Sequence, residues 1–218
     1  MKELFEEKLA KCSGRLSDRK AIADLILKNK ALYHYTLEKI TTPHSPNIQR
    51  LCWSLDIAFL ESPLYFREAF PYIVKGLCVQ KKDSCLRSLM KICAAMSQDP
   101  YYFTQIKKVP QKSNLLVERA LELLTEPHEV AVQVHAMETL FRWRHEFKWI
   151  GEHLADLIES QMEWKTAAYK ARSKRLLKTL KKESHSPQSN FLKRVLQKSH
   201  CERLNKQFLY KGFPIFAP

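Results

Sequence analysis

The chain has 218 residues, and its charge is unevenly distributed: residues 164–218 hold 14 of the 37 Lys and Arg residues but only two acids, Glu183 and Glu202. It contains only four glycines. Because tight hairpins and phosphate-binding loops both use glycine freely, this composition argues against a hairpin-rich sheet and against a glycine-rich nucleotide loop. It predicts an all-α chain, nearly neutral in its body, with a cationic end that attracts anionic partners.

The sequence predicts a cytoplasmic protein that does not enter a membrane. Residues 1–12 are charged throughout, unlike a signal peptide, and no run of about 18 apolar residues occurs. Most of the cysteines lie in apolar helical patterns, where a reduced cysteine acts as a small hydrophobic residue. We therefore expect no disulfide framework. The cysteines in these patterns are Cys52, Cys78, Cys85 and Cys93.

Apolar residues recur at helical spacing along the body of the chain. Residues at i, i+3, i+4 and i+7 share one face of a helix, so each stripe predicts a helix with one buried side. No segment alternates with the period of two that is typical of strands. The stripes cover Ile48–Ala58, Phe66–Leu77, Val117–Leu124, Val130–Phe141 and Ile150–Ile158.

Capping residues and prolines separate these stripes. Ser, Asp and Asn accept hydrogen bonds from the first helical turn, and proline is tolerated there. Pro71 is expected to open a helix after a short turn over residues 64–70, and Tyr101–Phe103 is expected in the longest link between helices. Helix starts are predicted at Ser17-Asp18, Ser45-Pro46, Asp83-Ser84, Ser113-Asn114 and Glu126-Pro127.

Pairing the helices gives a crude repeat. Pairs that start near residues 17, 46, 83, 128 and 165 have spacings that bracket two-helix repeat architectures. Ser45–Leu51 and Lys82–Leu89 share a polar opening turn, then an arginine, then an apolar stripe, and both resemble the first helix of HEAT repeats. The chain thus resembles HEAT-like, armadillo-type repeat proteins. We expect a right-handed α-solenoid of about five antiparallel helix pairs over residues 1–183, with exposed faces that bind extended partners.

A narrower resemblance concerns a group of short bacterial HEAT-like proteins of unassigned function. Its residues are Arg50–Asp56, Tyr72–Leu77, Val132–Leu140 and Glu146–Ile150. Some members of that group carry the name adenylosuccinate lyase. The flexible Gly-Ser-Ser-x-Met-Pro-x-Lys loop of those enzymes does not occur in this sequence, and Lys211–Pro214 is not a match for it. The resemblance therefore does not imply lyase activity.

The chain changes character near residue 183. Glu183–Asn190 reads as a polar linker. A basic helix is expected over Phe191–Gln207, followed by the apolar tail Phe208–Pro218. We expect residues 184–218 to form a separate region whose tail docks on the body and caps the last repeat. Whether this tail fills a groove that a partner needs is left open.

The helix expected over residues 165–182 holds the candidate binding site. Its apolar side is expected from Tyr169, Leu176 and Leu180, and lysines repeat along another side. Lysines four residues apart repel each other by a few tenths of a kcal/mol, roughly, unless an anion relieves them. The row suits a polyanion, an acidic protein, or no ligand at all. The candidate residues are Lys170, Arg172, Lys174, Arg175, Lys178, Lys181 and Lys182.

The segment Phe141–Trp149 interleaves aromatic residues with arginine. Such residues can stack on bases, but they also commonly fill the corner between two helices, which is the interpretation we favour. Alkylpurine DNA glycosylases built from HEAT-like repeats resemble this chain in size and basicity, and use tryptophans with a carboxylate. Trp143 and Trp149 have no aspartate nearby in the sequence. Glycosylase-like repair thus remains a remote alternative.

Chemistry-bearing motifs are weak. No two histidines lie three or four residues apart, no Gly-x-Ser-x-Gly turn occurs, and Cys52 or Cys93 would need a histidine brought close by the fold. We expect no cofactor, metal or catalytic residue, although the sequence leaves enzymatic activity open. The leading hypothesis is a non-enzymatic repeat module that binds an acidic protein or peptide through its basic end and concave face. The alternative is nucleic-acid binding through the same lysines.

Overall fold

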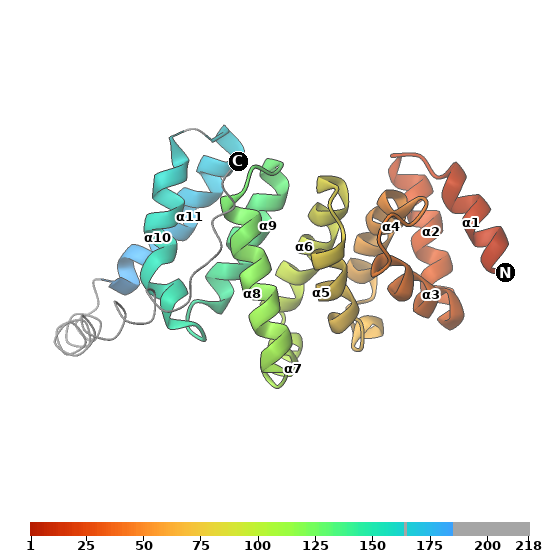
Figure 1. Cartoon of the computed structure of the whole chain (residues 1–218), viewed down its shortest axis with the longest axis horizontal. Coiled ribbons are helices and arrows are strands. Elements are labelled where there is room, and N and C mark those ends of the chain that lie inside the picture. The colour runs from red at the N-terminus through yellow and green to blue at the C-terminus, as the bar shows by residue number, and fades with distance from the viewer. Residues whose placement is uncertain (164, 185–218) are drawn as a thin grey trace, which may run out of the picture. The chain divides into compact units, whose positions relative to one another are not determined.

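The computed structural model describes residues 1–163 and 165–184 (Figure 1). All regular elements in these ranges are helices, so the prediction of an all-α chain is confirmed. The expected linker beyond residue 184, the basic helix and the apolar tail lie outside the described residues. The chain divides between Lys170 and Ala171 into two units.

Unit 1 contains ten α-helices and one short 3-10 helix within its described residues, and α11 crosses the unit boundary. The elements are α1 (Lys2–Lys11), α2 (Leu16–Lys28), α3 (Lys30–Ile40), α4 (Ile48–Glu61), η1 (Pro63–Phe66), α5 (Phe70–Val79), α6 (Asp83–Gln98), α7 (Pro100–Lys107), α8 (Pro110–Thr125), α9 (Val130–Trp143), α10 (Lys148–Met162) and α11 (Ala167–Ser184).

Helix packing in unit 1 follows two rows. In one row, α2 packs on α4, α4 on α6, and α6 on α9. In the other, α3 packs on α5 and α5 on α8, while α3, α5 and α8 also contact α4, α6 and α9 of the first row. Figure 1 shows these helices following one another along the unit. Apolar side chains along α4 and α5 are buried, as their stripes predict, and so are Val117, Ala120 and Leu124 in α8, whereas Leu121 is only partly covered.

The stripe predicted for α9 is shifted from the face that the structure buries. Val130, Val134 and Phe141 are only partly covered, whereas Val132, Ala136 and other neighbouring residues are buried. The reason is that α9 packs against α6, α8 and α10, so its buried surface is wider than a single stripe. The full buried set is Val132, Gln133, Ala136, Met137, Thr139, Leu140 and Trp143.

Three predicted helix starts lie within two residues of the observed ones, which are Leu16, Ile48 and Asp83. The start predicted at Glu126-Pro127 is three residues before Val130, and the start predicted at Ser113 is three residues after the observed one. Helix α8 begins at Pro110, and the Ser113 hydroxyl donates to the Pro110 carbonyl oxygen (3.0 Å) from inside the first turn. Proline has no backbone N–H, but an N–H at the first helical position has no partner within the helix. Proline therefore suits this start.

The expected link at Tyr101–Phe103 is instead part of helix α7. The Asp99 side chain accepts hydrogen bonds from the backbone N–H groups of Tyr101 and Tyr102, at 2.8 and 3.1 Å. Asp99 is therefore a side-chain N-cap, and Pro100 follows at the first helical position. The pair Asp99-Pro100 is typical of a helix start, so the prediction of a link at Tyr101–Phe103 is wrong.

Side chains from the next helix cap the ends of α3 and α5. The Gln80 amide Nε2 donates to the carbonyl oxygens of Ile40 (2.7 Å) and Thr42 (3.2 Å). Arg119 Nε in α8 donates to the Leu77 carbonyl oxygen (3.1 Å) near the end of α5. Such carbonyls have no partner within their own helix, so these bonds satisfy groups that would otherwise lack one. They also tie each helix of the row α3–α5–α8 to the next.

Replacing Gln80 tests this connection. We expect Gln80→Leu to lower the free energy of unfolding by about 1–3 kcal/mol, because a buried side chain of similar size would leave two carbonyls without their donor. Urea denaturation measures the change. Gln111→Leu, at an exposed position, is the matched control and should change stability by less than about 0.5 kcal/mol. Equal effects of the two substitutions would contradict the capping role.

Candidate functional site

Helix α11 contains all of the basic residues predicted to bind a polyanion. Its apolar side is buried at Tyr169, Leu176 and Leu180, as expected, together with Ser173 and Leu177. The described part of α11 is therefore amphipathic, with its bases outside the buried side. The exposed bases are Lys174, Arg175, Lys178, Lys181 and Lys182, and the partly exposed ones are Lys170 and Arg172.

The charge of this surface is concentrated. No acidic residue occurs in the sequence between Glu163 and Glu183, so the predicted lysine row has no acid interspersed along the helix. Within unit 1, Lys170 Nζ donates to the Glu163 carbonyl oxygen (3.3 Å), while Lys165 Nζ donates to Gln133 (2.8 Å). A helix face with this charge attracts anions at long range, and salt screens the attraction.

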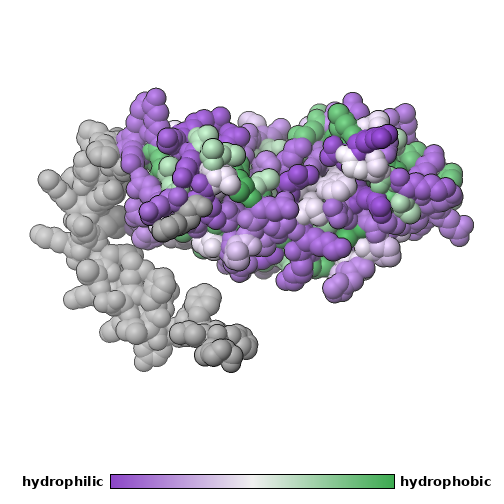
Figure 2. Space-filling view, turned by 90° about the horizontal axis from the view of Figure 1, so that it is seen from above, coloured by the Kyte–Doolittle hydropathy of each residue, from purple (hydrophilic) through white to green (hydrophobic). Residues whose placement is uncertain are grey.

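On the side displayed in Figure 2, the surface of the molecule has few large apolar regions to which a partner could bind. There, hydrophilic residues surround small separate apolar patches. Scattered apolar side chains are normal on a protein surface. Charge is therefore the more informative surface feature of this chain.

The aromatic corner between α9 and α10 is mostly packing, as favoured from the sequence. Trp143 is buried, and its indole Nε1 donates to Ser97 Oγ in α6 (3.0 Å). Its ring centroid lies 4.7 Å from that of Phe103 and 5.8 Å from that of Phe147. A buried indole cannot stack on a base. Trp149, by contrast, is 38% exposed.

The cysteines that could act as nucleophiles are poorly suited to that role. Burial raises the pKa of the Cys93 thiol. The pKa of the Cys52 thiol is also raised, mainly by the hydrogen bond between Cys52 and Cys85 and further by burial. A protonated thiol is a weak nucleophile, so neither side chain is activated in this structure. The described cysteines are all free, and Cys201 lies outside the described residues.

Two histidines contact carboxylates. His128 Nδ1 lies 2.7 Å from Asp83 Oδ1, and His135 Nδ1 lies 3.5 Å from Glu138 Oε2. Across residues 1–163 and 165–184, no three His, Cys, Asp or Glu side chains cluster closely enough to hold a metal ion. In the same ranges, no helix has both the length and the apolar character needed to cross a bilayer.

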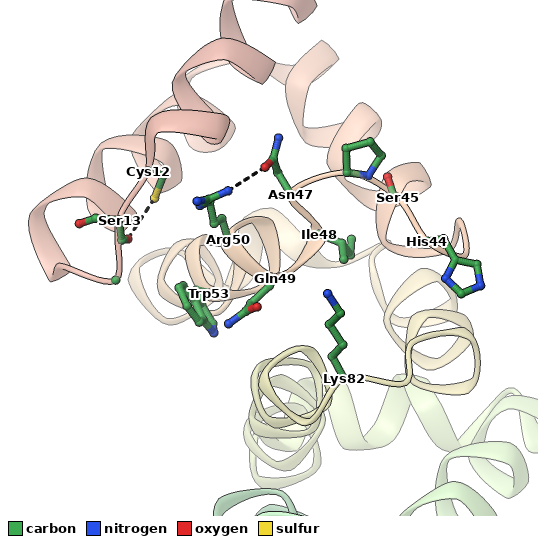
Figure 3. A pocket seen from close by; sticks show the side chains of 12 residues that line it. Cys12, Ser13, His44, Ser45, Asn47, Ile48, Gln49, Arg50, Trp53 and Lys82 are labelled. Carbon is green, nitrogen blue, oxygen red and sulfur yellow. Dashed lines mark hydrogen bonds between the residues drawn. The ribbon is translucent and has the colours of Figure 1, made fainter.

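Unit 1 also contains a pocket of about 560 Å³ that sequence reasoning missed. Three separate segments line it: Cys12–Gly14 after α1, His44–Arg50 with Trp53 at the start of α4, and Lys82 just before α6. Figure 3 shows the Lys82 side chain extending towards the first turn of α4, with Gln49 and Trp53 side by side. The pocket is thus built where the starts of α4 and α6 come together.

Part of the pocket wall lies in segments that the sequence pattern had singled out. The two helix openings that suggested a repeat, Ser45–Leu51 and Lys82–Leu89, supply most of its wall. What the sequence did not reveal is the backbone between α3 and α4, where His44 and Asn47 have left-handed φ angles of 53° and 56°. Non-glycine residues seldom adopt this conformation, although Asn and His do so more often than most.

Comparison with known protein families, with curated proteins and with solved structures finds no match for this chain.

Two tryptophan substitutions test the assignment of the aromatic corner. Trp143→Phe removes the bond to Ser97 and leaves a smaller ring in a buried position, so we expect unfolding to become easier by about 1–3 kcal/mol. Trp149→Phe changes a partly exposed ring and should cost less than about 0.5 kcal/mol. Chemical denaturation followed by circular dichroism gives both values. If Trp149 proved the costlier of the two, the assignment would be wrong.

Proposed function

We propose that the chain is a non-enzymatic helical-repeat module that binds an acidic protein or peptide. The proposed architecture is a right-handed α-solenoid of about five antiparallel helix pairs, whose basic C-terminal end and concave face bind the partner. Two observations in unit 1 support the repeat: the row α2–α4–α6–α9 and the row α3–α5–α8 each pack in chain order. Stacked helix pairs of this kind contact mainly their neighbours and leave extended faces for binding.

The observation that carries the proposed partner is the basic face of α11. Lys174, Arg175, Lys178 and Lys182 are exposed, while the apolar side of the same helix is buried. The lysines thus remain exposed even though the helix is packed. Clustered exposed cations speed association with an acidic partner and suppress binding to basic ones.

Nucleic acid is the second candidate, because the same lysines could neutralise phosphates. Each phosphate contact releases condensed counterions, so binding weakens steeply with salt. An acidic peptide carries a less dense charge and should show a shallower dependence. The slope of affinity against salt therefore helps to separate the two partners.

A substitution set in α11 tests the proposal. We expect Lys174→Gln, Lys178→Gln and Lys182→Gln together to weaken binding of a fluorescent poly-glutamate peptide by tenfold or more, roughly, since three charge-assisted contacts are lost. Fluorescence anisotropy across a salt series measures the affinity. A labelled 20-base-pair DNA is titrated in parallel; if it binds more tightly, and the substitutions reduce its log–log salt slope by about 3, nucleic acid becomes the first candidate.

The control removes the same charge elsewhere. Lys8, Lys28 and Lys75 are exposed in α1, α2 and α5, and their change to Gln should alter affinity by no more than about twofold. Equal loss in the two variants would show that net charge, and not the face of α11, governs binding. Absence of binding to either probe would reject the proposed role of this face.

A further inference from the structure

The pocket at the starts of α4 and α6 has cations but no acid. Among the described residues that line it, none is Asp or Glu, whereas Arg50 and Lys82 both contribute positive charge. Arg50 is partly buried, and Lys82 is exposed. Two cations from different segments that line one cavity repel each other, and an anion between them would remove that repulsion.

Two donors around the pocket are not used within the protein. Among the described residues, Lys82 has no ion-pair partner, and the buried Trp53 indole N–H has no hydrogen-bond partner. Asn47, at the N-cap of α4, does not cap that helix; its Oδ1 instead accepts from Arg50 Nη1 (2.8 Å). A ligand with acceptor oxygens would supply a partner for the exposed Lys82 ammonium.

The pocket wall is held in place by contacts outside the pocket. The Gln80 amide holds the carbonyls of Ile40 and Thr42, immediately before the left-handed residues His44 and Asn47. The bond between Asn47 and Arg50 closes the same loop on α4 and orients the guanidinium, as Figure 3 shows. A wall that is already ordered loses little conformational entropy when a ligand binds.

We propose that this pocket binds a small phosphate monoester with an organic group attached. Arg50 and Lys82 would hold the phosphate, because a guanidinium matches its geometry and two cations balance its two negative charges. Trp53 and Pro46 provide apolar surface for the organic group. A cavity of about 560 Å³ has the size of small-molecule sites. Its lining residues belong to unit 1 and are distant in sequence from the basic residues of α11.

Phenyl phosphate is a direct probe, because it combines the anion with a ring. In proton–nitrogen NMR spectra of the full chain, we expect the Trp53 indole signal and the amides of Gln49 and Arg50 to shift and saturate. Trp53→Phe assigns the indole signal. Inorganic phosphate should bind more weakly because it lacks the ring, and phenol, which lacks the anion, should cause no saturable shift.

A pair of neighbouring lysines supplies the matched variants. Lys82→Gln should weaken phenyl phosphate binding by about tenfold, since one charge-assisted contact is lost. Lys81→Gln removes the same charge from an exposed residue that does not line the pocket, and should change affinity by less than about twofold. The α11 triple variant should bind phenyl phosphate as the parent chain does, which keeps this test separate from that of the basic helix.

Four results would overturn the proposal. These are shifts that do not saturate, equal weakening by Lys81→Gln and Lys82→Gln, phenyl phosphate that binds no better than inorganic phosphate, and phenol that binds as well as phenyl phosphate. If phenyl phosphate binds no better than inorganic phosphate, the pocket binds an adventitious ion only. The comparison of phenol with phenyl phosphate needs no variant, so the test stands even if a substitution disturbs folding.

Discussion

Gln80 makes the hydrogen bonds on which much of unit 1 depends. From the end of α5 it donates to the carbonyls of Ile40 and Thr42, so that the end of α3 and the loop after it are fixed to the next helix of the row. Gly76, one turn earlier, lies close to the same carbonyl: a Cβ there would make an ordinary contact of 3.4 Å with the Ile40 oxygen and a tighter one of 3.3 Å with Leu89 Cδ1. Arg119 in α8 makes a similar hydrogen bond to the Leu77 carbonyl oxygen near the end of α5. Helix ends are thus satisfied by neighbours, which orders the row and shapes the pocket wall.

The two proposed binding surfaces differ in how the fold creates them. On α11 the charge lies on one helix, and its periodicity against the buried residues Tyr169, Leu176 and Leu180 exposes it. The pocket instead combines Arg50 of α4 with Lys82 before α6, which are distant in sequence. A large, flexible acidic partner suits the first surface, because exposed charges act at long range. A small ligand suits the second, because it is a concave site where side chains from separate segments converge.

Prediction from sequence succeeded where a local pattern carries the physics. The stripe from Phe66 to Leu77, which begins in η1 and continues in α5, is buried as expected, and proline or acid residues located several helix starts. It failed where local signals compete. Tyr101–Phe103 is predicted in a link although Asp99 caps a helix there, since a proline such as Pro100 can either end one helix or begin another. The buried face of α9 was misplaced because its width depends on how many helices surround it, which no stripe reveals.

The sequence by itself determined that the described chain is helical, that most of its apolar faces are buried and that α11 carries an amphipathic basic surface, because these properties follow from spacing and charge along one helix. Only the tertiary structure decided that Trp143 is buried against Ser97, and that Arg50 and Lys82 share one pocket with Trp53. It also decided the left-handed backbone of His44 and Asn47. These features arise from contacts between distant segments and from a loop fixed at both ends, and no local pattern encodes either.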